Sequence, residues 1–173
     1  MKKLENRIAV VTGAASGMGK ATAKKMAEYG AKVNIIDFSP EVMAYAEELR
    51  NLGYEVTGYQ ADVRDAERLK EIYKEVYEKY GRIDAVVNAA GVAVFTDFTD
   101  DSIDAEAHRE IDINYFGVWN SCRAAAPYMK EAKYGKIVNF SSVTGVLVCD
   151  PGSSAYAGTK GAVMAFTKAL ASE

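Results

Sequence analysis

The residues Thr12-Gly13-Ala14-Ala15-Ser16-Gly17-Met18-Gly19 form a glycine-rich stretch between an apolar run, residues 8–11, and a segment of helical composition that stops at Gly30. Glycines let the backbone approach a bulky anion closely, and the start of the following helix offers free N–H groups and a partial positive charge. The context of strand, turn and helix therefore predicts a site for the phosphates of a dinucleotide. The alternative is an ordinary turn between a strand and a helix.

The rest of the chain repeats the alternation of strand and helix. Near-continuous apolar strands separated by helices are typical of a parallel sheet that is covered on both faces. The predicted strands cover residues 8–11, 32–36, 55–60, 83–87 and 136–140. The fold class is therefore α/β, with one domain over residues 1–173, a doubly wound parallel sheet, right-handed crossovers and the strand order 3-2-1-4-5.

Capping residues mark the ends of several helices. Ser39-Pro40-Glu41 supplies an N-cap, a proline at the first helical position and an acid in the first turn of a helix that ends before Gly53. Asp65 is expected to cap the next helix, and Gly81 to end it. This helix is predicted over residues 66–79, and the others over residues 17–29, 111–132 and 155–172.

The composition narrows the class of protein. The chain has 173 residues, of which 49% are apolar and 26% charged, as in an ordinary globular domain. A net charge of −3 gives no basic field for nucleic acid or an anionic membrane, and no apolar run is long enough to span a bilayer. Cys122 and Cys149 have no metal or redox spacing, and His108 is the only histidine, so we expect no metal site and a reducing, cytoplasmic location.

Asp37 ends the second predicted strand, 24 residues after Gly13. An acid at this point accepts hydrogen bonds from the hydroxyls of an adenosine ribose and repels a 2′-phosphate. Its neighbours Phe38 and Ser16 add no cation, so the sequence favours NAD over NADP. The alternative for Asp37 is an acid that caps the helix after Pro40.

A phenol and an ammonium are predicted on one helix face near the end of the chain. Tyr156 is the only one of the 11 tyrosines with a lysine four residues later, Lys160. Residues four apart in a helix are neighbours. Together with the glycine-rich turn, the pair indicates hydride transfer to or from a carbonyl.

Taken in order, the motifs resemble those of the short-chain dehydrogenase/reductase family along the whole chain. The glycine spacing Thr-Gly-x3-Gly-x-Gly matches that family, Asp62-Val63 looks like its adenine-binding pair, and Asn88-Ala89-Ala90-Gly91 looks like the segment after its fourth strand. Thr159 replaces a more usual serine, and the 14 residues from Ser142 to Tyr156 imply a loop one residue longer than common.

The resemblance implies a Rossmann fold and assigns site residues. The implied catalytic residues are Asn114, Ser142, Tyr156 and Lys160, with Ser141 as an alternative to Ser142. The implied cofactor contacts are Gly13, Ser16, Gly17, Met18, Gly19, Asp37, Phe38, Asp62, Val63, Asn88, Ala89, Ala90, Gly91, Tyr156 and Lys160.

Each implied catalytic residue has an expected role. Lys160 lowers the pKa of the Tyr156 phenol, which then exchanges a proton with the substrate oxygen. Ser142 donates a hydrogen bond to that oxygen, Lys160 also holds the ribose hydroxyls, and Asn114 holds a water that relays protons.

The chain ends early by the standard of this resemblance. Glu173 comes 13 residues after Lys160, whereas the family implies a sixth strand, a lid-like helical segment and a seventh strand. We therefore expect a truncated domain that lacks the family's C-terminal strands. Its fifth strand has an open edge, which either the rest of a longer protein or a partner covers.

The substrate expected from the sequence is a small molecule, a secondary alcohol or its ketone. Residues 146–149 are apolar, which favours a hydrophobic or steroid-like compound, unless these side chains pack into the core or a subunit interface. The alternatives are a 3-oxoacyl thioester ketoreductase and a non-catalytic nucleotide-binding or assembly module. We also expect a homo-oligomer, a dimer or tetramer, built from the helices at 111–132 and 155–172.

Overall fold

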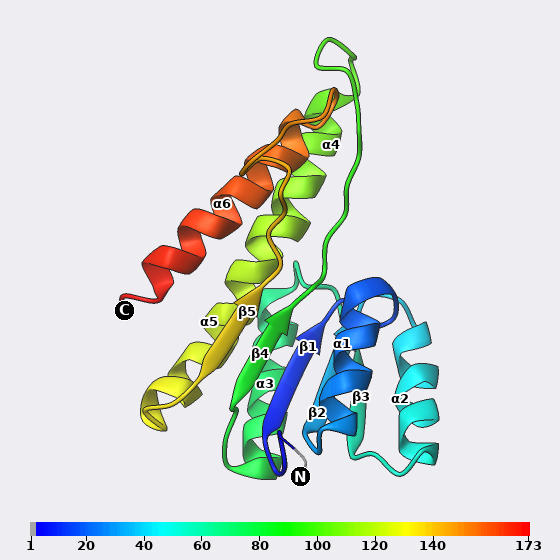
Figure 1. The fold of residues 1–173 in the computed structure, drawn as a ribbon, viewed down its shortest axis with the longest axis vertical. Helices are drawn as coiled ribbons and strands as arrows, with labels where there is room; N and C mark the ends of the chain where they lie inside the picture. The colour runs from blue at the N-terminus through cyan, green and yellow to red at the C-terminus, as the bar shows by residue number, and fades with distance from the viewer. Residues whose placement is uncertain (1–2) are drawn as a thin grey trace.

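A computed structural model describes residues 3–173 and has a five-stranded parallel sheet at its centre (Figure 1). The strands are β1 (Ile8–Thr12), β2 (Lys32–Asp37), β3 (Val56–Gln60), β4 (Ala85–Asn88) and β5 (Lys136–Asn139). They lie in the order β3-β2-β1-β4-β5, which confirms the predicted topology. In the register, Ala9 of β1 pairs with Val33 on one side and with Ala85 on the other.

Helices cover both faces of the sheet. They are α1 (Gly17–Glu28), α2 (Glu41–Asn51), α3 (Ala66–Tyr80), α4 (Ile103–Glu110), α5 (Gly117–Glu131) and α6 (Ser154–Leu170), with a π-helical segment, η1 (Ile111–Phe116), between α4 and α5. Successive strand residues point to opposite faces. Val10 and Val86 accordingly pack with α3 and α5, whereas Val11 and Val87 pack with α1 and α2.

The predicted caps are confirmed at α3 and shifted by one residue at α2. The side chain of Asp65 accepts a hydrogen bond from the N–H of Arg68 at 2.9 Å, and Gly81 ends α3 with a φ of 72°. Ser39 accepts one from the N–H of Glu41 through its Oγ at 3.3 Å, but Pro40 is the capping residue rather than the first helical one. The carbonyl of Ser39 accepts from the N–H of Val42, only three residues on, at 3.2 Å, so regular α-helix begins one residue later than predicted, within the usual margin.

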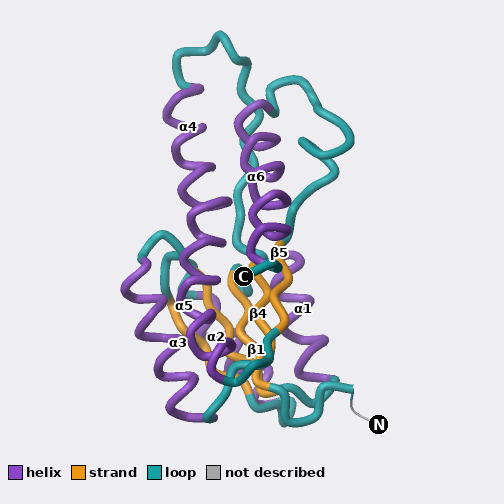
Figure 2. The backbone as a smooth tube through the Cα atoms, turned by 90° about the vertical axis from the view of Figure 1, so that its left-hand side faces the viewer, coloured by secondary structure: helices purple, strands orange, loops and turns teal. Residues whose placement is uncertain are grey.

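The helix expected at residues 111–132 is longer than predicted. It continues back through η1 and α4 to Ile103, and Figure 2 shows α4 and α6 rising together beyond the sheet. The N–H of Gly117 donates to the carbonyl of Asp112, which closes the wide π turn. Gly117 fits here because a Cβ would lie 2.6 Å from Val63 Cγ2.

Two loops extend beyond the carboxyl ends of β4 and β5 (Figure 1). Residues 89–102 connect β4 to α4, and residues 140–153 connect β5 to α6. The N–H of Thr96 in the first loop donates to the carbonyl of Gly152 in the second at 3.0 Å. These loops and the glycine-rich turn surround the region where the predicted site residues lie.

β5 forms the edge of the sheet, with β4 as its only strand partner among residues 3–173. Val138 in this strand remains 53% exposed, since none of the described helices covers its side. Every helix within residues 3–173 is too short or too polar to cross a membrane.

Candidate active site

The glycine-rich turn packs directly on the segment that follows β4. Gly13 has a φ of +68°, and a Cβ there would lie 2.5 Å from the backbone nitrogen of Ala90. A Cβ on Gly17, whose φ is +51°, would instead meet no atom within 4 Å. Glycine adopts a positive φ without strain. Its missing Cβ also permits the close packing at Gly13 and leaves the space at Gly17 open.

The N-terminus of α1 is left free for an anion. Ser16 makes no capping hydrogen bond with its side chain, and the first turn of α1 contains no acid. The first N–H groups of a helix need partners and carry a partial positive charge. This uncapped terminus beside the open space at Gly17 fits the phosphates of a dinucleotide.

A cavity of about 460 Å³ opens in front of this turn. Twelve of the expected cofactor residues line it: Gly13, Ser16, Gly17, Met18, Gly19, Asp37, Phe38, Asp62, Val63, Ala89, Ala90 and Gly91. The structure adds four residues that the sequence did not single out, namely Arg64, Val92, Arg109 and Ile113. Arg109 and Ile113 belong to the unpredicted α4 and to η1. Arg64 directly follows Asp62-Val63, which is a signal that was available in the sequence.

Asp37 links the glycine-rich turn to the end of β2. Its Oδ2 accepts a hydrogen bond from the N–H of Ala15, and its Oδ1 accepts one from the N–H of Ser39, both at 2.9 Å. Ser39 precedes α2, so this carboxylate does not cap the helix itself. Each oxygen keeps a further lone pair with which it can accept another hydrogen bond, and Asp37 lines the cavity.

The two arginines of the cavity are each paired with an acid. Arg64 forms a hydrogen-bonded ion pair with Asp62, at 2.6 Å in its shortest contact, and these bonds lower the pKa of the Asp62 carboxyl. Arg109 contacts Glu106 at 3.3 Å. Both cations are thereby partly neutralised.

Asn88 lies beneath the cavity rather than on its wall. Its side chain is buried, and Nδ2 donates to Asn139 Oδ1 at 2.8 Å and to Cys122 Sγ at 3.4 Å. It thus connects the end of β4 to β5 and α5.

Asn114 lies in the π-helical segment η1 and is completely buried. Its Nδ2 donates to the carbonyl of Val92, and its Oδ1 accepts from the N–H of Val92, both at 2.8 Å. Nδ2 also donates to Thr159 Oγ1 at 3.2 Å. The side chain therefore fixes the segment after β4 against α6.

Thr159, where the sequence departs from the family's more usual serine, takes part in the same bracing. Its hydroxyl donates to the carbonyl of Tyr156 at 2.8 Å while it accepts from Asn114. Both bonds are made by the hydroxyl group, which serine also carries on its Cβ. Threonine at this position therefore keeps the hydrogen bonds that a serine could make.

Lys160 and Tyr156 lie together on α6, one turn apart. Lys160 is only 5% exposed, its Nζ donates to the carbonyl of Phe140 at 2.8 Å, and burial lowers its pKa. The same Nζ lies 5.7 Å from the centre of the half-buried Tyr156 ring. The ring of Phe95 stands 6.5 Å from that of Tyr156. The phenol is therefore near a buried cation and beside an aromatic wall.

The two serines after β5 have different partners. Ser141 Oγ donates to the carbonyl of Lys160 at 2.8 Å and so is used within the fold. Ser142 Oγ accepts from the N–H of Thr144 at 3.1 Å. Within residues 3–173 its hydroxyl proton has no acceptor, which leaves that proton available to a ligand.

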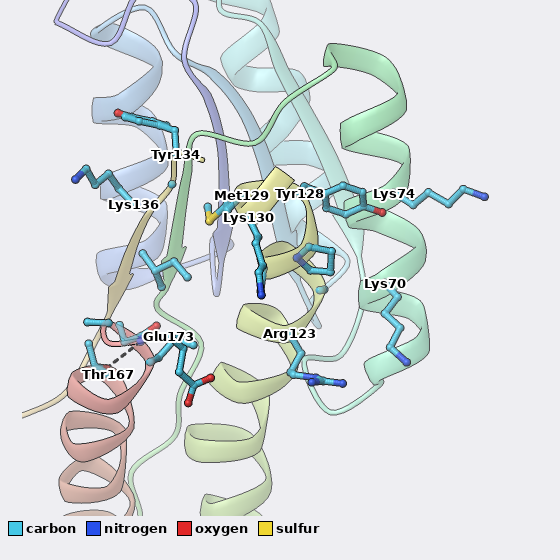
Figure 3. A pocket seen from close by; sticks show the side chains of 18 of the residues that line it. Lys70, Lys74, Arg123, Tyr128, Met129, Lys130, Tyr134, Lys136, Thr167 and Glu173 are labelled. Carbon is cyan, nitrogen blue, oxygen red and sulfur yellow. Dashed lines mark hydrogen bonds between the residues drawn. The ribbon is translucent and has the colours of Figure 1, made fainter. Parts of the chain in front are cut away.

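A second cavity, of about 1470 Å³, contains none of the predicted catalytic residues. It lies between α3, α5, β5 and the end of α6, and basic side chains such as Lys70, Lys74 and Arg123 line it (Figure 3). Across residues 3–173, no group of three or more His, Cys, Asp or Glu side chains is placed to hold a metal ion.

The sequence that forms this arrangement of glycine-rich turn, buried lysine and tyrosine is similar to that of a known protein family. A family profile described as short chain dehydrogenase matches residues 7–173. The chain belongs to this family.

Relatives in the family carry the names of oxidoreductases. Oxidoreductase UcpA of Escherichia coli K12 is 45% identical over 173 residues, which is all of this chain and 65% of that protein. The 3-oxoacyl-[acyl-carrier-protein] reductase FabG of Thermotoga maritima is 38% identical over 175 residues, covering 99% of this chain and 69% of its own length.

Solved structures share the fold. A short chain dehydrogenase from Mycobacterium smegmatis superposes with a TM-score of 0.91 at 31% identity, over 98% of this chain and 72% of that one. The crystal structure of gox2181 gives a TM-score of 0.93 at 34% identity, over 98% of this chain and 66% of that one. The chain thus spans about two thirds of the length of these relatives and solved structures.

Proposed function

We propose that the protein is an NAD-dependent oxidoreductase that interconverts a secondary alcohol and a ketone. The observation that carries this proposal is the pair on α6, where the buried ammonium of Lys160 lies 5.7 Å from the Tyr156 ring. Membership of a family whose relatives are named oxidoreductases supports it. Because the chain spans 65% of UcpA, the proposal concerns the activity of the whole protein.

The catalytic roles follow from charge and hydrogen bonding. Tyr156 takes the proton of the alcohol during oxidation and returns it during reduction. Lys160 favours the phenolate form of Tyr156, because a nearby positive charge stabilises a negative one. Ser142 donates its free hydroxyl proton to the substrate oxygen, on which charge develops. NAD, when bound, supplies the hydride acceptor, and NADH the donor.

The cofactor residues would hold the dinucleotide in a defined direction. Asp37 would bind the adenosine ribose, and the uncapped N-terminus of α1 would bind the phosphates. Gly91, where a Cβ would lie 3.4 Å from Lys160 Nζ, would lie beside the nicotinamide half. Lys160 would bind the ribose hydroxyls next to the nicotinamide. Asn114 holds the wall at Gly91 and Val92 in place and, through a remaining lone pair or its backbone, would position a relay water.

NAD is favoured over NADP by Asp37. A 2′-phosphate would lie against its carboxylate, whose two oxygens are fixed by backbone N–H groups. Arg64 and Arg109 also line the cavity, but each is paired with an acid.

The substrate we propose is hydrophobic. Exposed apolar side chains gather on the loop before α6, with Val143 62%, Leu147 78% and Val148 54% exposed. Phe95 adds an aromatic surface next to Tyr156. The similarity to FabG of Thermotoga maritima makes a 3-oxoacyl thioester the second candidate substrate, although Asp37 favours a cofactor without the 2′-phosphate.

One experiment separates these functions. The protein is incubated with NAD or NADH and a panel of steroid and aliphatic alcohols and ketones together with 3-oxoacyl thioesters, and the absorbance of NADH is followed. Turnover of a hydrophobic alcohol or ketone supports the proposal, and turnover of thioesters alone supports the second candidate. Binding of NADH without turnover of any compound by the whole protein identifies a nucleotide-binding module.

Assembly into a homo-oligomer is a further part of the proposal. The rings of Tyr115, Trp119 and Phe166 form a cluster where η1, α5 and α6 meet, with Phe116 beside it. Phe116 is 47% exposed and Trp119 39% exposed, so the cluster presents aromatic surface that a second copy would bury.

A further inference from the structure

Glu110 is a buried acid that the proposed chemistry does not use. It is the last residue of α4, just before η1, and its side chain is completely inaccessible to solvent. Its Oε1 accepts a hydrogen bond from the N–H of Val94 at 2.7 Å. Glu110 and Asn114 thus lie one turn apart and hold neighbouring residues, Val94 and Val92, of the segment after β4.

The second oxygen of this carboxyl has no partner. Glu110 Oε2 is buried and forms no hydrogen bond within residues 3–173. Burial of an ionised carboxylate is costly unless another charge compensates it. Burial accordingly raises the pKa of Glu110, whereas the hydrogen bond from Val94 lowers it.

Among the described residues, Lys160 is a buried cation without an ion-pair partner, as Glu110 is a buried acid without one. Its ammonium is buried, its hydrogen-bond partner is the carbonyl of Phe140, and no carboxylate of residues 3–173 lies within ion-pair distance. The helix that carries it, α6, packs against α4. A Cβ at Gly91 would lie 3.1 Å from Asn114 Oδ1 and 3.4 Å from Lys160 Nζ, so the ammonium lies against the start of the segment that Asn114 and Glu110 hold. Burial lowers the pKa of Lys160 while the charge of Glu110 raises it, and Lys160 in turn lowers the pKa of Glu110.

We propose that Glu110 is a positioning residue whose carboxylate acts across the Val92–Val94 segment to keep the buried Lys160 charged. This inference rests on the proposed role of Lys160 in favouring the Tyr156 phenolate. The segment carries no titratable group, and Asn114 is the neutral neighbour on η1. The other charges near Glu110 are Glu106 and Arg109 on α4, which oppose one another in their effect on it.

The test measures the pKa of Lys160 directly. The Cε signal of Lys160, labelled with carbon-13 and assigned by its loss in Lys160→Arg, is followed from pH 5 to 11 by NMR in the full chain. Glu110→Gln keeps an oxygen that accepts from Val94 but removes the charge. We expect the pKa of Lys160 to fall by about 1 unit in this variant. Glu106→Gln removes the same charge one turn earlier and serves as the control, with a much smaller change.

Two results would overturn the inference. One is an unchanged Lys160 titration in Glu110→Gln, and the other is an equal fall in Glu106→Gln, which would assign the effect to the overall charge of α4. Should Glu110→Gln fail to fold, the unmodified protein gives the answer. The N–H of Val94 and the Cε of Lys160 must then report one common step as Glu110 ionises, and absence of that step refutes the coupling.

These measurements need no turnover, so they are independent of the proposed reaction. In an active form of the protein, Glu110→Gln should also shift the alkaline limit of kcat/KM to lower pH. If the Lys160 titration shifts and the enzyme shows no dehydrogenase activity, the proposed function fails and the coupling stands.

Discussion

The side chain of Asn114 and the backbone of Val92 form two reciprocal hydrogen bonds, each 2.8 Å long. Asn114 lies in the π-helical segment, and Val92 lies in the loop that leads away from β4. The pair therefore joins a helical segment to a loop that forms no regular secondary structure with it. This junction lies beside Gly91 and Lys160.

Asn114→Ala should destabilise the protein. The change removes three hydrogen bonds of a fully buried side chain and takes from the partly buried N–H and C=O of Val92 their partners, so we expect a loss of about 2 kcal/mol or more in the free energy of unfolding. Urea unfolding followed by circular dichroism measures it. Asn120→Ala, which removes a bond to the carbonyl of Val63 at a half-buried site, is the control and should cost less. Equal losses would contradict the bracing role.

Tyr156→Phe should lower turnover by about 10²-fold or more while it leaves the affinity for NADH nearly unchanged, because phenylalanine keeps the ring but has no proton to transfer. Lys160→Ala should impair both turnover and NADH binding. Lys168→Ala, at an exposed position of the same helix, is the control. Steady-state kinetics and fluorescence titration measure the two effects. Near-normal turnover by Tyr156→Phe would remove this residue from the mechanism.

NADH should bind more tightly than NADPH, and Asp37→Ala should reduce or abolish that preference. The physical reason is repulsion between the carboxylate and a 2′-phosphate. Calorimetric titration of both cofactors tests this, with Glu41→Gln as a control that removes an acid from the start of α2. Tighter binding of NADPH by the unmodified protein would overturn the choice of cofactor.

The ion pair between Asp62 and Arg64 should contribute a small stability that depends on pH. Since the pair lowers the pKa of Asp62 in the folded state, its contribution is present above the unfolded pKa, about 3.9, and is lost as the pH falls through the folded value. Arg64→Met should therefore cost less than about 1 kcal/mol at pH 7. The difference from the unmodified protein should shrink below pH 4. A difference independent of pH would assign the effect to packing.

Trp119→Glu should weaken self-association, because it places a charge in the exposed aromatic cluster. Sedimentation velocity over a range of protein concentrations measures this. Met43→Glu, at an exposed site on α2, is the control and should leave the assembly unchanged. A monomeric unmodified protein would show that the cluster has no partner of its own kind.

The sheet could be predicted from the sequence because its strands are short runs rich in β-branched residues, and they alternate with helical stretches that glycines and capping residues delimit. Asp65 and Gly81 marked α3 correctly for the same local reason. α4 was missed since residues 97–110 are rich in acids and resemble a solvated loop, although Ile103 begins a helix there. The π turn also escaped prediction. It ends at Gly117, where a Cβ would lie 2.6 Å from Val63 Cγ2, and no local pattern reveals a contact between residues so far apart in the sequence.

The residues of the candidate site also differ in whether the sequence could predict them. Residues in local motifs, such as Gly13 and Tyr156, could be named from their spacing. Arg109 and Glu110 could not, because their roles depend on a helix that the pattern did not reveal and on a partner in another element.

The hydrogen bond from the N–H of Thr96 to the carbonyl of Gly152 joins the two loops that stand over Tyr156. Gly152 has a φ of 75°, and a Cβ there would lie 3.2 Å from the nitrogen of Thr96, so the contact requires glycine. A molecule that enters or leaves between these loops must break this bond or displace both loops at once. The exchange of the Thr96 amide with deuterated water therefore measures directly how often the two loops separate.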